Sequence, residues 1–461
     1  MKPIQLFFDK GSLLLKDLTE ELSKRLPGLK WDERVRLYRA PAHHYREIAL
    51  TLHKEGIEYV DEARDFEPLE MASRQEITAR SYQQEAMDAW LRGGRRGVVV
   101  LPTGAGKTIL AVLLMQRVRR PTLIHVPTID LMHQWRDVLA RFLDVEVGMM
   151  GGGFKEWAPV TVTTYDSALL HVTHKGNRFG LIIFDEAHRL PGEQYRFLAL
   201  GSIAPFRLGL TATPERADGG ERLLYQLCGP LTYRALIHQL TGTALAPYEV
   251  ITIEVDLKPE ERTLYEEANQ TYLDFLKNEN ITISAPRGWQ QFLWKTSRTP
   301  EGRRAFKAYR LQKSLSQASS AKEEWIFDLL QQHRGDRIIV FTWDNDMAYR
   351  IGRRYLLPVL THQTRPKERE STLTAFRDGS FPVIITSRVL NEGVDVPDAN
   401  VAIVVSGSGS VREHVQRLGR ILRARPGKTA ILYELISRET REYYVNKRRK
   451  RHHAYEKPGQ V

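Results

Sequence analysis

The segment 102–108, with the sequence PTGAGKT, has the residue types that bind the phosphates of a nucleotide. Its glycines let backbone N–H groups approach phosphate oxygens, its lysine offers charge to the β- and γ-phosphates, and its last hydroxyl suits a magnesium ion. The usual pattern has a glycine where this chain has Leu101. The alternative is a glycine-rich turn followed by a chance Lys-Thr pair, which would not explain the apolar strand pattern before the loop. The expected nucleotide contacts are Thr103, Gly104, Ala105, Gly106, Lys107 and Thr108.

Two adjacent carboxylates follow a second apolar run, in the sequence IIFDEAH that starts at Ile182. A buried strand delivers them at its C-terminal end, where α/β sheets bind ligands. We expect Asp185 to hold magnesium together with Thr108, and Glu186 to orient or deprotonate the attacking water. The competing interpretation is an N-capping pair before a helix.

A third candidate is the segment 416–423, with the sequence QRLGRILR. Arg420 and Arg423 are three residues apart and would share one face of a helix. Planar, permanently charged guanidinium groups at that spacing suit a γ-phosphate, as arginine fingers do. With Gln416 they form the predicted catalytic set of this segment, whereas the alternative is a solvated basic helix face.

The elements that position these residues follow from the apolar runs of the chain. Short runs that are apolar on both faces alternate with helical stretches between residues 97 and 210, and again from 337 to 434. This pattern is typical of parallel sheets covered by helices. The predicted fold is therefore α/β, with two such domains, a small α+β unit before them and a largely helical segment between them. The predicted domains are residues 1–68, 75–234, 235–320 and 321–461.

The amino-acid composition limits the kinds of partner that the protein can be expected to bind. The 461 residues carry 68 Lys and Arg against 56 Asp and Glu, a net charge of +12, which favours nucleic acid first and an acidic membrane surface second. The single cysteine excludes an internal disulfide, a paired-cysteine zinc finger and a four-cysteine iron–sulfur cluster. No run reaches the roughly 18 apolar residues of a membrane span. We expect a soluble, cytoplasmic protein with no membrane partner.

Residues 287–313 concentrate the positive charge, with a local balance of +7. Five aromatic residues interleave with the basic ones, among them Trp289. Basic groups can neutralise phosphates, and aromatic rings can stack on bases or wedge a duplex. The alternative is a helical hairpin with the aromatics in its own core and the basic residues solvated. The candidate nucleic-acid contacts here are Trp289, Arg303 and Arg304.

With these residues in place, the chain resembles the superfamily-two helicases, and among them the XPB family in its short, archaeal-type form. The resemblance covers nearly the whole chain. It implies two RecA-like motor domains, a thumb-like insertion between them and an N-terminal domain similar to a damage-recognition domain. Arg80 and Gln83 resemble the upstream motif whose glutamine reads adenine. Gly393 and Asp395, in NEGVDVP, are similar to residues that approach the nucleotide.

The resemblance also implies contacts to a nucleic-acid strand. The segment 216–218 stands where the family has Arg-Glu-Asp, an element proposed to help separate strands. Ala217 replaces the central acid, so this chain keeps only Arg216 and Asp218 of that element. The other strand contacts implied by matching motifs are Thr128, Thr164, Thr211, Thr213, His362 and Thr364.

The activity that the resemblance implies is an ATP-dependent DNA translocase or helicase of 3′-to-5′ polarity, with ATP and Mg²⁺ as cofactors. It would open duplex DNA in nucleotide excision repair, or serve transcription. Duplex, forked or bubble DNA is the expected partner, with a nuclease as a second one, and the chain is expected to be a monomer or a heterodimer. Two alternatives stay open. One is an ATP-gated, DNA-bound scaffold that recruits a nuclease without processive unwinding, and the other is an RNA helicase.

Overall fold

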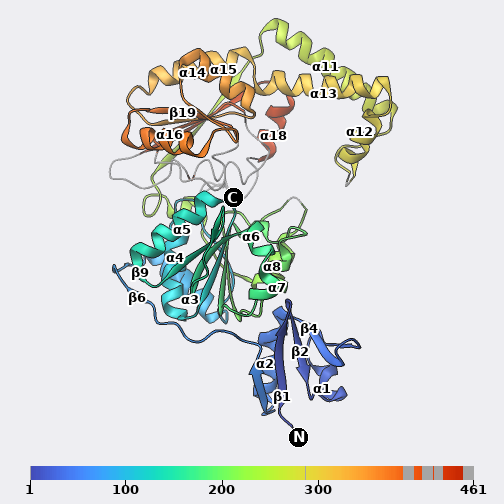
Figure 1. Ribbon diagram of the computed structural model, residues 1–461. Helices are drawn as coiled ribbons and strands as arrows, with labels where there is room; N and C mark the ends of the chain where they lie inside the picture. Colours follow the sequence, from blue (N-terminus) through green and yellow to red (C-terminus); the bar gives the residue numbers. More distant parts are fainter. Residues whose placement is uncertain are drawn as a thin grey trace. The chain divides into compact units, whose positions relative to one another are not determined.

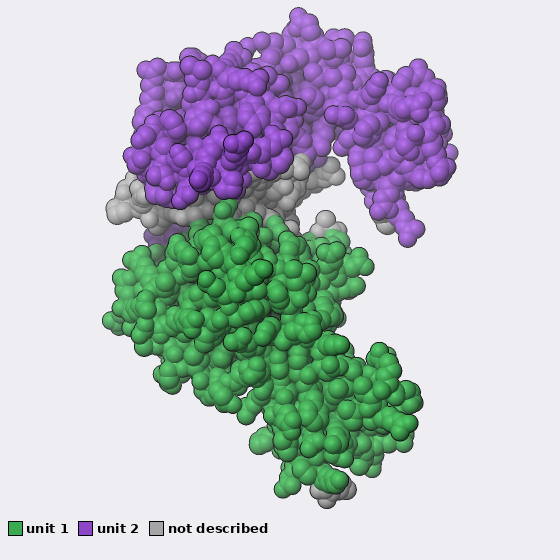
Figure 2. All heavy atoms as spheres, viewed as in Figure 1, with its two compact units in different colours: residues 1–239, 393–395 green, residues 240–392, 396–461 purple. Residues whose placement is uncertain are grey.

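The computed structural model describes residues 2–216, 218–285, 287–387, 399–406, 419 and 429–449. The chain divides into two compact units, shown in different colours in Figure 2. Of the described residues, those up to Gln239 belong to the first unit and those from Leu240 onward to the second. The finer division into four domains stays a prediction.

A five-stranded sheet opens the first unit, with the strand order β3-β4-β2-β1-β5. Strands β1 and β2 form a two-residue hairpin at Lys10 and Gly11, which both have positive φ angles, the geometry that matches the twist of antiparallel strands. The core includes Leu6, Leu13 and Ile48. The elements are β1 (Ile4–Asp9), β2 (Ser12–Lys16), α1 (Glu20–Arg25), β3 (Lys30–Asp32), β4 (Leu37–Pro41), η1 (Ala42–His44), α2 (Tyr45–Lys54) and β5 (Tyr59–Glu62).

An eight-stranded sheet follows, in the order β11-β10-β12-β8-β13-β14-β7-β15. All its pairs are parallel except β10 with β11. The central strands are buried along nearly their whole length, which explains their unbroken apolar runs. The strands are β7 (Arg96–Val100), β8 (Thr122–Val126), β10 (Val147–Gly151), β11 (Phe154–Lys155), β12 (Val160–Thr164), β13 (Leu181–Asp185), β14 (Phe206–Thr211) and β15 (Leu231–Arg234), with a separate pair β6 (Ala72–Ser73) and β9 (Leu143–Asp144).

Helices cover both faces of this sheet, with α3, α4 and α5 on one side and α6, α7 and α8 on the other (Figure 1). The predicted α/β architecture is confirmed for this part of the chain. The helices are α3 (Ser81–Arg92), α4 (Lys107–Val118), α5 (Ile129–Phe142), α6 (Tyr165–Leu169), α7 (Val172–Lys175), η2 (Ala187–Arg189), α8 (Arg196–Leu200), α9 (Glu221–Cys228) and α10 (Ile237–Leu240).

The second unit contains a six-stranded, all-parallel sheet in the order β16-β21-β20-β17-β19-β18. Its edge strand β16 lies within the segment that was predicted to be largely helical, so the helical part begins only at Pro259. The elements are β16 (Tyr248–Val255), α14 (Ser320–Gln332), β17 (Ile338–Phe341), α15 (Asn345–Tyr355), β18 (Val359–Leu360), α16 (Pro366–Asp378), β19 (Val383–Thr386), β20 (Val401–Val404), β21 (Ala430–Ser437) and α18 (Arg441–Arg449).

The helical insertion projects from this sheet. Helices α11 (Pro259–Asn278) and α13 (Pro300–Gln317) pack side by side, with α12 (Gly288–Thr296) at their far end (Figure 1). Both long helices start with a proline, whose fixed φ suits the first helical turn. Tyr272, Phe275 and Phe292 belong to a small core of the insertion's own.

Candidate nucleotide site and nucleic-acid surfaces

The phosphate loop lies between β7 and α4, as predicted. Gly104 and Gly106 have φ angles of 86° and 75°, in the left-handed region that only glycine adopts freely. A Cβ atom on Gly106 would lie 2.9 Å from Nε2 of Gln83. The loop therefore requires glycine there for its backbone conformation, and a side chain at this position would also displace the Gln83 amide.

Residues of α3 and its N-cap hold the phosphate loop through hydrogen bonds to its backbone. The Gln83 amide donates to the Gly106 carbonyl at 3.2 Å and accepts from the Arg80 backbone N–H at 3.0 Å. The Tyr82 hydroxyl donates to the Ala105 carbonyl at 2.6 Å. The structure thus places Gln83 next to the nucleotide loop, whereas its reading of adenine stays a prediction. Tyr82 was not among the predicted site residues.

Lys107 opens α4 and lies against its own loop. Its Nζ donates to the carbonyls of Leu101 and Pro102 at 3.3 and 3.4 Å. These neutral acceptors are weaker partners for an ammonium group than phosphate oxygens. Lys107 is thus positioned to exchange them for the phosphates of a nucleotide.

Asp185 ends β13 and is held by three elements. Its carboxylate accepts from Trp135 Nε1 of α5 at 2.8 Å and from the Glu186 backbone N–H at 2.9 Å, and its carbonyl accepts from the Tyr165 hydroxyl at 2.9 Å. Burial and, after it, the charge of Glu186 raise the pKa of Asp185 to about 6, although Lys107 opposes the rise. Trp135 was not predicted, because a tryptophan on the apolar face of a helix carries no signal of a polar role.

Glu186 has an unusual backbone conformation, with φ 49° and ψ 50°. A non-glycine residue in this left-handed region is strained, and such strain persists where the surroundings enforce it. Its Oε2 atom is buried, lies 3.4 Å from Nδ1 of His188 and accepts no hydrogen bond from the described residues. A buried carboxylate oxygen with spare acceptor capacity can take a proton from water.

Thr211 and Thr213 lie near His188 rather than on an open surface. Both are buried, and the Thr211 hydroxyl contacts Nδ1 of His188, the Thr213 carbonyl and the Thr213 N–H, each at 3.2 Å. Arg216 donates to the His188 carbonyl at 2.7 Å and pairs with Asp218 at 2.6 Å. Through His188, the Thr211 and Arg216 side chains and the Thr213 backbone are therefore connected to Glu186.

Thr164 is the last residue of β12, and Thr128 follows the neighbouring parallel strand β8 by two residues, at the same edge of the sheet. Each hydroxyl caps a helix: Thr128 accepts from Leu131 N at 3.3 Å and Thr164 from Ser167 N at 3.2 Å. Their role as helix caps is thus part of the structure, while their contact with a strand stays a prediction.

The second unit brings three polar side chains together at the carboxyl edge of its sheet. His362, after β18, is exposed and its Nδ1 lies 3.3 Å from Nδ2 of Asn345. Asn345 in turn accepts from the Ser387 hydroxyl, after β19, at 2.7 Å. Thr364 is buried and accepts from the Thr361 N–H at 2.9 Å, so it shapes the turn that presents His362.

The insertion divides its aromatic residues between core and surface. Phe292 is fully buried, whereas Trp289 is 38% and Trp294 is 54% exposed. Arg303 and Arg304 are exposed on α13, with Arg304 paired to Glu301 at 3.0 Å. The insertion thus has an aromatic core of its own, while contact between its exposed residues and nucleic acid stays a prediction.

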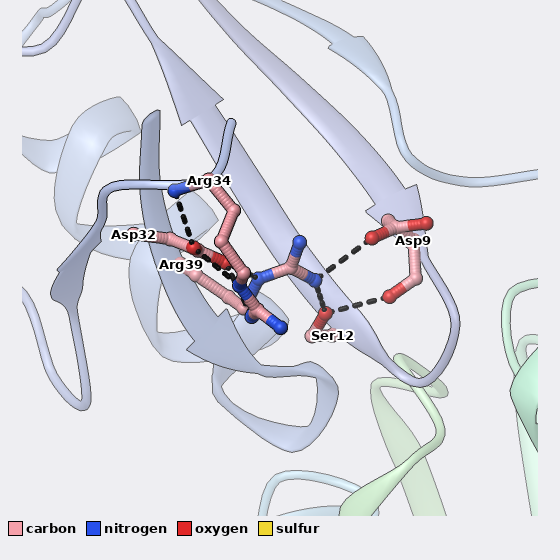
Figure 3. A network of polar contacts seen from close by, with 5 residues as sticks. All are labelled: Asp9, Ser12, Asp32, Arg34 and Arg39. Carbon is pink, nitrogen blue, oxygen red and sulfur yellow. Dashed lines mark hydrogen bonds and ion pairs between the residues drawn. The ribbon is translucent and has the colours of Figure 1, made fainter. Parts of the chain in front are cut away.

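A network of charged groups organises the N-terminal domain (Figure 3). Arg39 donates to Asp32 at 2.7 Å and to Asp9 at 2.8 Å, and it also contacts the Ser12 hydroxyl. Arg34 pairs with Asp32 through two hydrogen bonds of 2.8 and 2.9 Å. The two guanidinium groups hold the pKa of Asp32 well below its usual range.

An open cavity of about 800 Å³ adjoins this network. Trp31, which is 49% exposed, lies on its wall together with Lys10, Lys30 and Arg34. The cavity is lined mainly by residues 31–34 and 39–41 of the N-terminal domain.

Several predicted residues lie outside the described part of the chain: Gln416, Arg420, Arg423, Gly393, Asp395 and Ala217. Within the described part, no cluster of three or more His, Cys, Asp or Glu side chains forms a ready-made metal site. Among the helices described, none combines the length and apolar character that crossing a lipid bilayer requires.

Comparisons with known proteins give matches along most of the chain. Residues 6–63 match the xeroderma pigmentosum group B helicase damage recognition domain, residues 76–216 the res subunit of type III restriction enzymes, and residues 320–454 the ERCC3/RAD25/XPB C-terminal helicase family. The DNA 3′-5′ translocase XPB2 of Sulfurisphaera tokodaii is 40% identical over 92% of this chain and 96% of its own length. The DNA 3′-5′ helicase XPB of Mycobacterium tuberculosis is 33% identical over 80% of this chain and 63% of its own.

A solved structure supports the fold. The Hef helicase domain of Pyrococcus furiosus superposes on 80% of this chain and 98% of its own, with a TM-score of 0.53 at 19% identity. The likeness is consistent with two RecA-like domains, as predicted from the sequence.

Proposed function

The chain belongs to the XPB family of helicases, and we propose that it uses ATP to move along DNA with 3′-to-5′ polarity and to open duplex DNA during nucleotide excision repair. One observation carries the proposal. The phosphate loop, Asp185 and Glu186 come together at the carboxyl edge of one parallel sheet, at the ends of β7 and β13 with only β14 between them. The names of the relatives support DNA as the substrate and the polarity.

In the proposed reaction the loop binds the phosphates of ATP. Backbone N–H groups of residues 104–108 and the dipole of α4 attract the phosphate oxygens, and Lys107 exchanges its carbonyl partners for them. Gln83 and Tyr82 keep the loop in the conformation that receives the nucleotide.

Glu186 is the proposed catalytic base. Water attacks the γ-phosphorus, the bond to the β–γ bridging oxygen breaks, and ADP leaves with that electron pair while a water proton passes to Oε2 of Glu186. The buried position of Oε2 and its spare acceptor capacity support this role.

Asp185 and Thr108 are the proposed ligands of a divalent cation, for which Mg²⁺ is our choice. A carboxylate and a hydroxyl are hard oxygen donors, and Mg²⁺ bound with a nucleotide needs only one or two protein ligands besides phosphates and water. When bound, the ion neutralises the phosphate charge that develops during the transfer. Trp135 and the Glu186 N–H fix the Asp185 carboxylate in place for this purpose.

The network from Glu186 through His188 to Thr211 and Arg216 is our proposed link between hydrolysis and the nucleic-acid surface. It is continuous, and each contact can take a second arrangement when Glu186 receives a proton. The exposed Trp289 and Arg303 of the insertion, His362, and the cavity beside Arg34 are the proposed DNA contacts.

The decisive experiment measures ATP hydrolysis alone and with duplex, forked and single-stranded DNA or with RNA. We expect stimulation by DNA, and strongest stimulation by a fork. Hydrolysis that no nucleic acid changes would exclude a motor, and stimulation by RNA in preference to DNA would make the protein an RNA helicase. Lys107→Ala should abolish hydrolysis on every substrate.

A second candidate function is a DNA-bound scaffold that marks a lesion for a nuclease. The element 216–218, with alanine in its centre, and the organised N-terminal domain favour it. Strand displacement by the isolated chain, as a monomer, would exclude this candidate. Unwinding or incision that appears only with an added nuclease would support it, in the form of a heterodimer.

We also propose that the protein acts in the cytoplasm, where a single thiol stays reduced. Cys228 is buried, and burial raises the pKa of its thiol to about 12, so it is a packing residue rather than a reactive group.

A further inference from the structure

A cavity of about 240 Å³ lies where the insertion joins the sheet of the second unit. Its lining comes from the C-terminal part of α13, from α18, from Tyr265 of α11 and from Trp343, which follows β17. One water molecule needs only about 10–15 Å³ of such space, so the cavity has room for a planar organic ring.

Gln312 on α13 lines this cavity and is 1% exposed. Neither its amide oxygen nor its amide nitrogen has a hydrogen-bond partner among the described residues. A buried amide without partners destabilises the fold, so its retention points to a partner that arrives from outside. A glutamine side chain has three rotatable bonds, and its amide can therefore turn toward whatever fills the cavity.

The other walls favour a flat anionic ligand. Nζ of Lys313 lies 4.2 Å from the centre of the Trp343 ring and 6.0 Å from that of Tyr309, and Arg441 of α18 also lines the cavity. The one carboxylate in the lining, Glu442, is paired with the buried Lys322 at 2.6 Å. Aromatic faces, two cations and an amide are the groups that bind a base together with its phosphate.

The cavity adjoins the edge of the sheet at which we placed a DNA contact. Trp343 and Asn345 both follow β17, and Asn345 contacts His362 and Ser387 from the ends of β18 and β19. A DNA strand that contacts His362 therefore passes along the same edge of the sheet, where Trp343 lies. Nothing in the proposed translocase function requires a pocket at this place.

We propose that this cavity receives one unstacked base of the DNA strand, with its edge on the Gln312 amide, its face on Trp343 or Tyr309, and its phosphate on Lys313 or Arg441. The inference rests on the proposed function, because the strand must be DNA. A free nucleotide has the same chemistry, and the experiment has to separate the two sources.

The test combines an abasic scan with Gln312→Leu. One strand of a fork is made with a single abasic nucleotide at each position in turn, and its affinity is measured for both proteins. In the wild type, one position or two adjacent ones should weaken binding by about fivefold or more. Gln312→Leu should reduce that penalty at least about threefold and leave the other positions unchanged. Gln331→Leu is the control, because it makes the same substitution at an exposed glutamine near the C-terminal end of α14, outside the cavity lining.

Thermal unfolding without DNA separates a binding role from a structural one. Since leucine removes an unpaired amide and keeps its volume, the Tm of Gln312→Leu should equal or exceed that of the wild type. A lower Tm with unchanged abasic penalties would mean that the amide is structural and would overturn the proposal. Equal penalties at every position in both proteins would overturn it too.

Photocrosslinking identifies the source of the base. 5-Iododeoxyuridine at the sensitive position should crosslink to the peptide that holds Tyr309 or Trp343, and free 5-iododeoxyuridine monophosphate should not. Crosslinking by the free nucleotide alone would make this a small-molecule site and refute the strand assignment. If the crosslinking result is negative and DNA also fails to stimulate hydrolysis by the wild type, the proposed translocase function is wrong. If the crosslinking result is negative but DNA does stimulate hydrolysis, only the proposed base-binding cavity is wrong.

Discussion

At the scale of single residues, Glu186 has a backbone conformation that glutamate rarely adopts, and a carboxylate oxygen that is buried beside His188. Asp185, next to it in sequence, is held by hydrogen bonds from Trp135 and from the backbone. Two adjacent carboxyl groups thus have different surroundings, which suits two different tasks, proton acceptance and cation binding.

Glu186→Gln tests the task of the first carboxyl group. Glutamine keeps the shape but cannot accept a proton, so we expect ATP affinity within about twofold of the wild type and hydrolysis lowered about 10²–10⁴-fold. Equilibrium binding and single-turnover hydrolysis measure the two quantities. Glu193→Gln, at an exposed position nearby, is the control and should change neither. A large loss of ATP affinity in Glu186→Gln would contradict its role as the base.

The pH profile of cation-dependent ATP binding tests the second carboxyl group, Asp185, through its acid limb, the fall in binding at low pH. A carboxyl with a pKa of about 6 is protonated below that pH and then cannot hold a cation. Cation-dependent ATP binding should therefore weaken as the pH falls through 6, by at most about tenfold per pH unit. In stability, the same raised pKa means that the folded state binds the extra proton between pH 4 and 6, so Asp185 makes unfolding easier as the pH rises through that window.

Trp135→Phe should move this limb. The indole N–H stabilises the charged carboxylate, so its loss raises the pKa of Asp185 and shifts the limb upward by about half a unit to one unit. Trp90→Phe is the matched control, because Trp90 is also buried and donates one hydrogen bond, to the Arg207 carbonyl. Identical pH profiles for the two variants would show that Trp135 does not tune the carboxyl group.

At the scale of elements, the strands β13 and β14 end side by side and bring Glu186 close to the segment after β14. Thr211 is the junction, because its hydroxyl contacts both His188 and Thr213. The ends of two adjacent strands can thus shift together when the charge on Glu186 changes.

Thr211→Val tests this junction. Valine keeps the shape and removes the hydroxyl, so basal hydrolysis should stay within a few-fold while its stimulation by DNA falls about fivefold or more. Thr161→Val is the control. Thr161 is equally buried near the start of β12, and its hydroxyl donates to the Ala158 carbonyl and accepts from the Ala158 N–H. Both variants should lose about 1–3 kcal/mol of stability. Equal DNA stimulation in both would show that Thr211 has only a structural role.

Most parallel strands could be predicted, because a strand buried on both faces needs an unbroken apolar run. Strand β16 was missed because Glu249, Thr252 and Glu254 interrupt its apolar run and its partner β21 lies far along the chain. The phosphate loop and the two carboxylates were predictable because their chemistry depends on local spacing. Trp135, Tyr82 and Gln312 were not, since their roles depend on which groups the tertiary fold places opposite them.

At the scale of the whole molecule, the net charge of +12 is unevenly distributed, and residues 287–313 alone contribute +7. Many of these basic groups, including Arg303, are exposed on the insertion. A long, basic projection of this kind increases the affinity for DNA in proportion to the phosphates that it neutralises.

Arg303→Ala tests the insertion through the salt dependence of DNA binding. Loss of one phosphate contact should lower the slope of log affinity against log salt by about 0.7–0.9. Arg334→Ala removes an equally exposed charge beyond the end of α14 and should leave the slope unchanged. Equal slopes for both variants would show that overall charge, rather than the insertion, sets the affinity.

The pairing of β16 with β21 has a consequence for synthesis of the chain. Tyr248 pairs with Ala430, so the edge strand leaves the ribosome long before its partner exists. The eight-stranded sheet of the first unit has all its strands within residues 96–234 and can form while synthesis continues. Until then β16 presents unpaired N–H and C=O groups, which attract other chains. We expect ribosome-bound chains truncated before β21 to aggregate, and chains that include it to acquire protease resistance in residues 248–255.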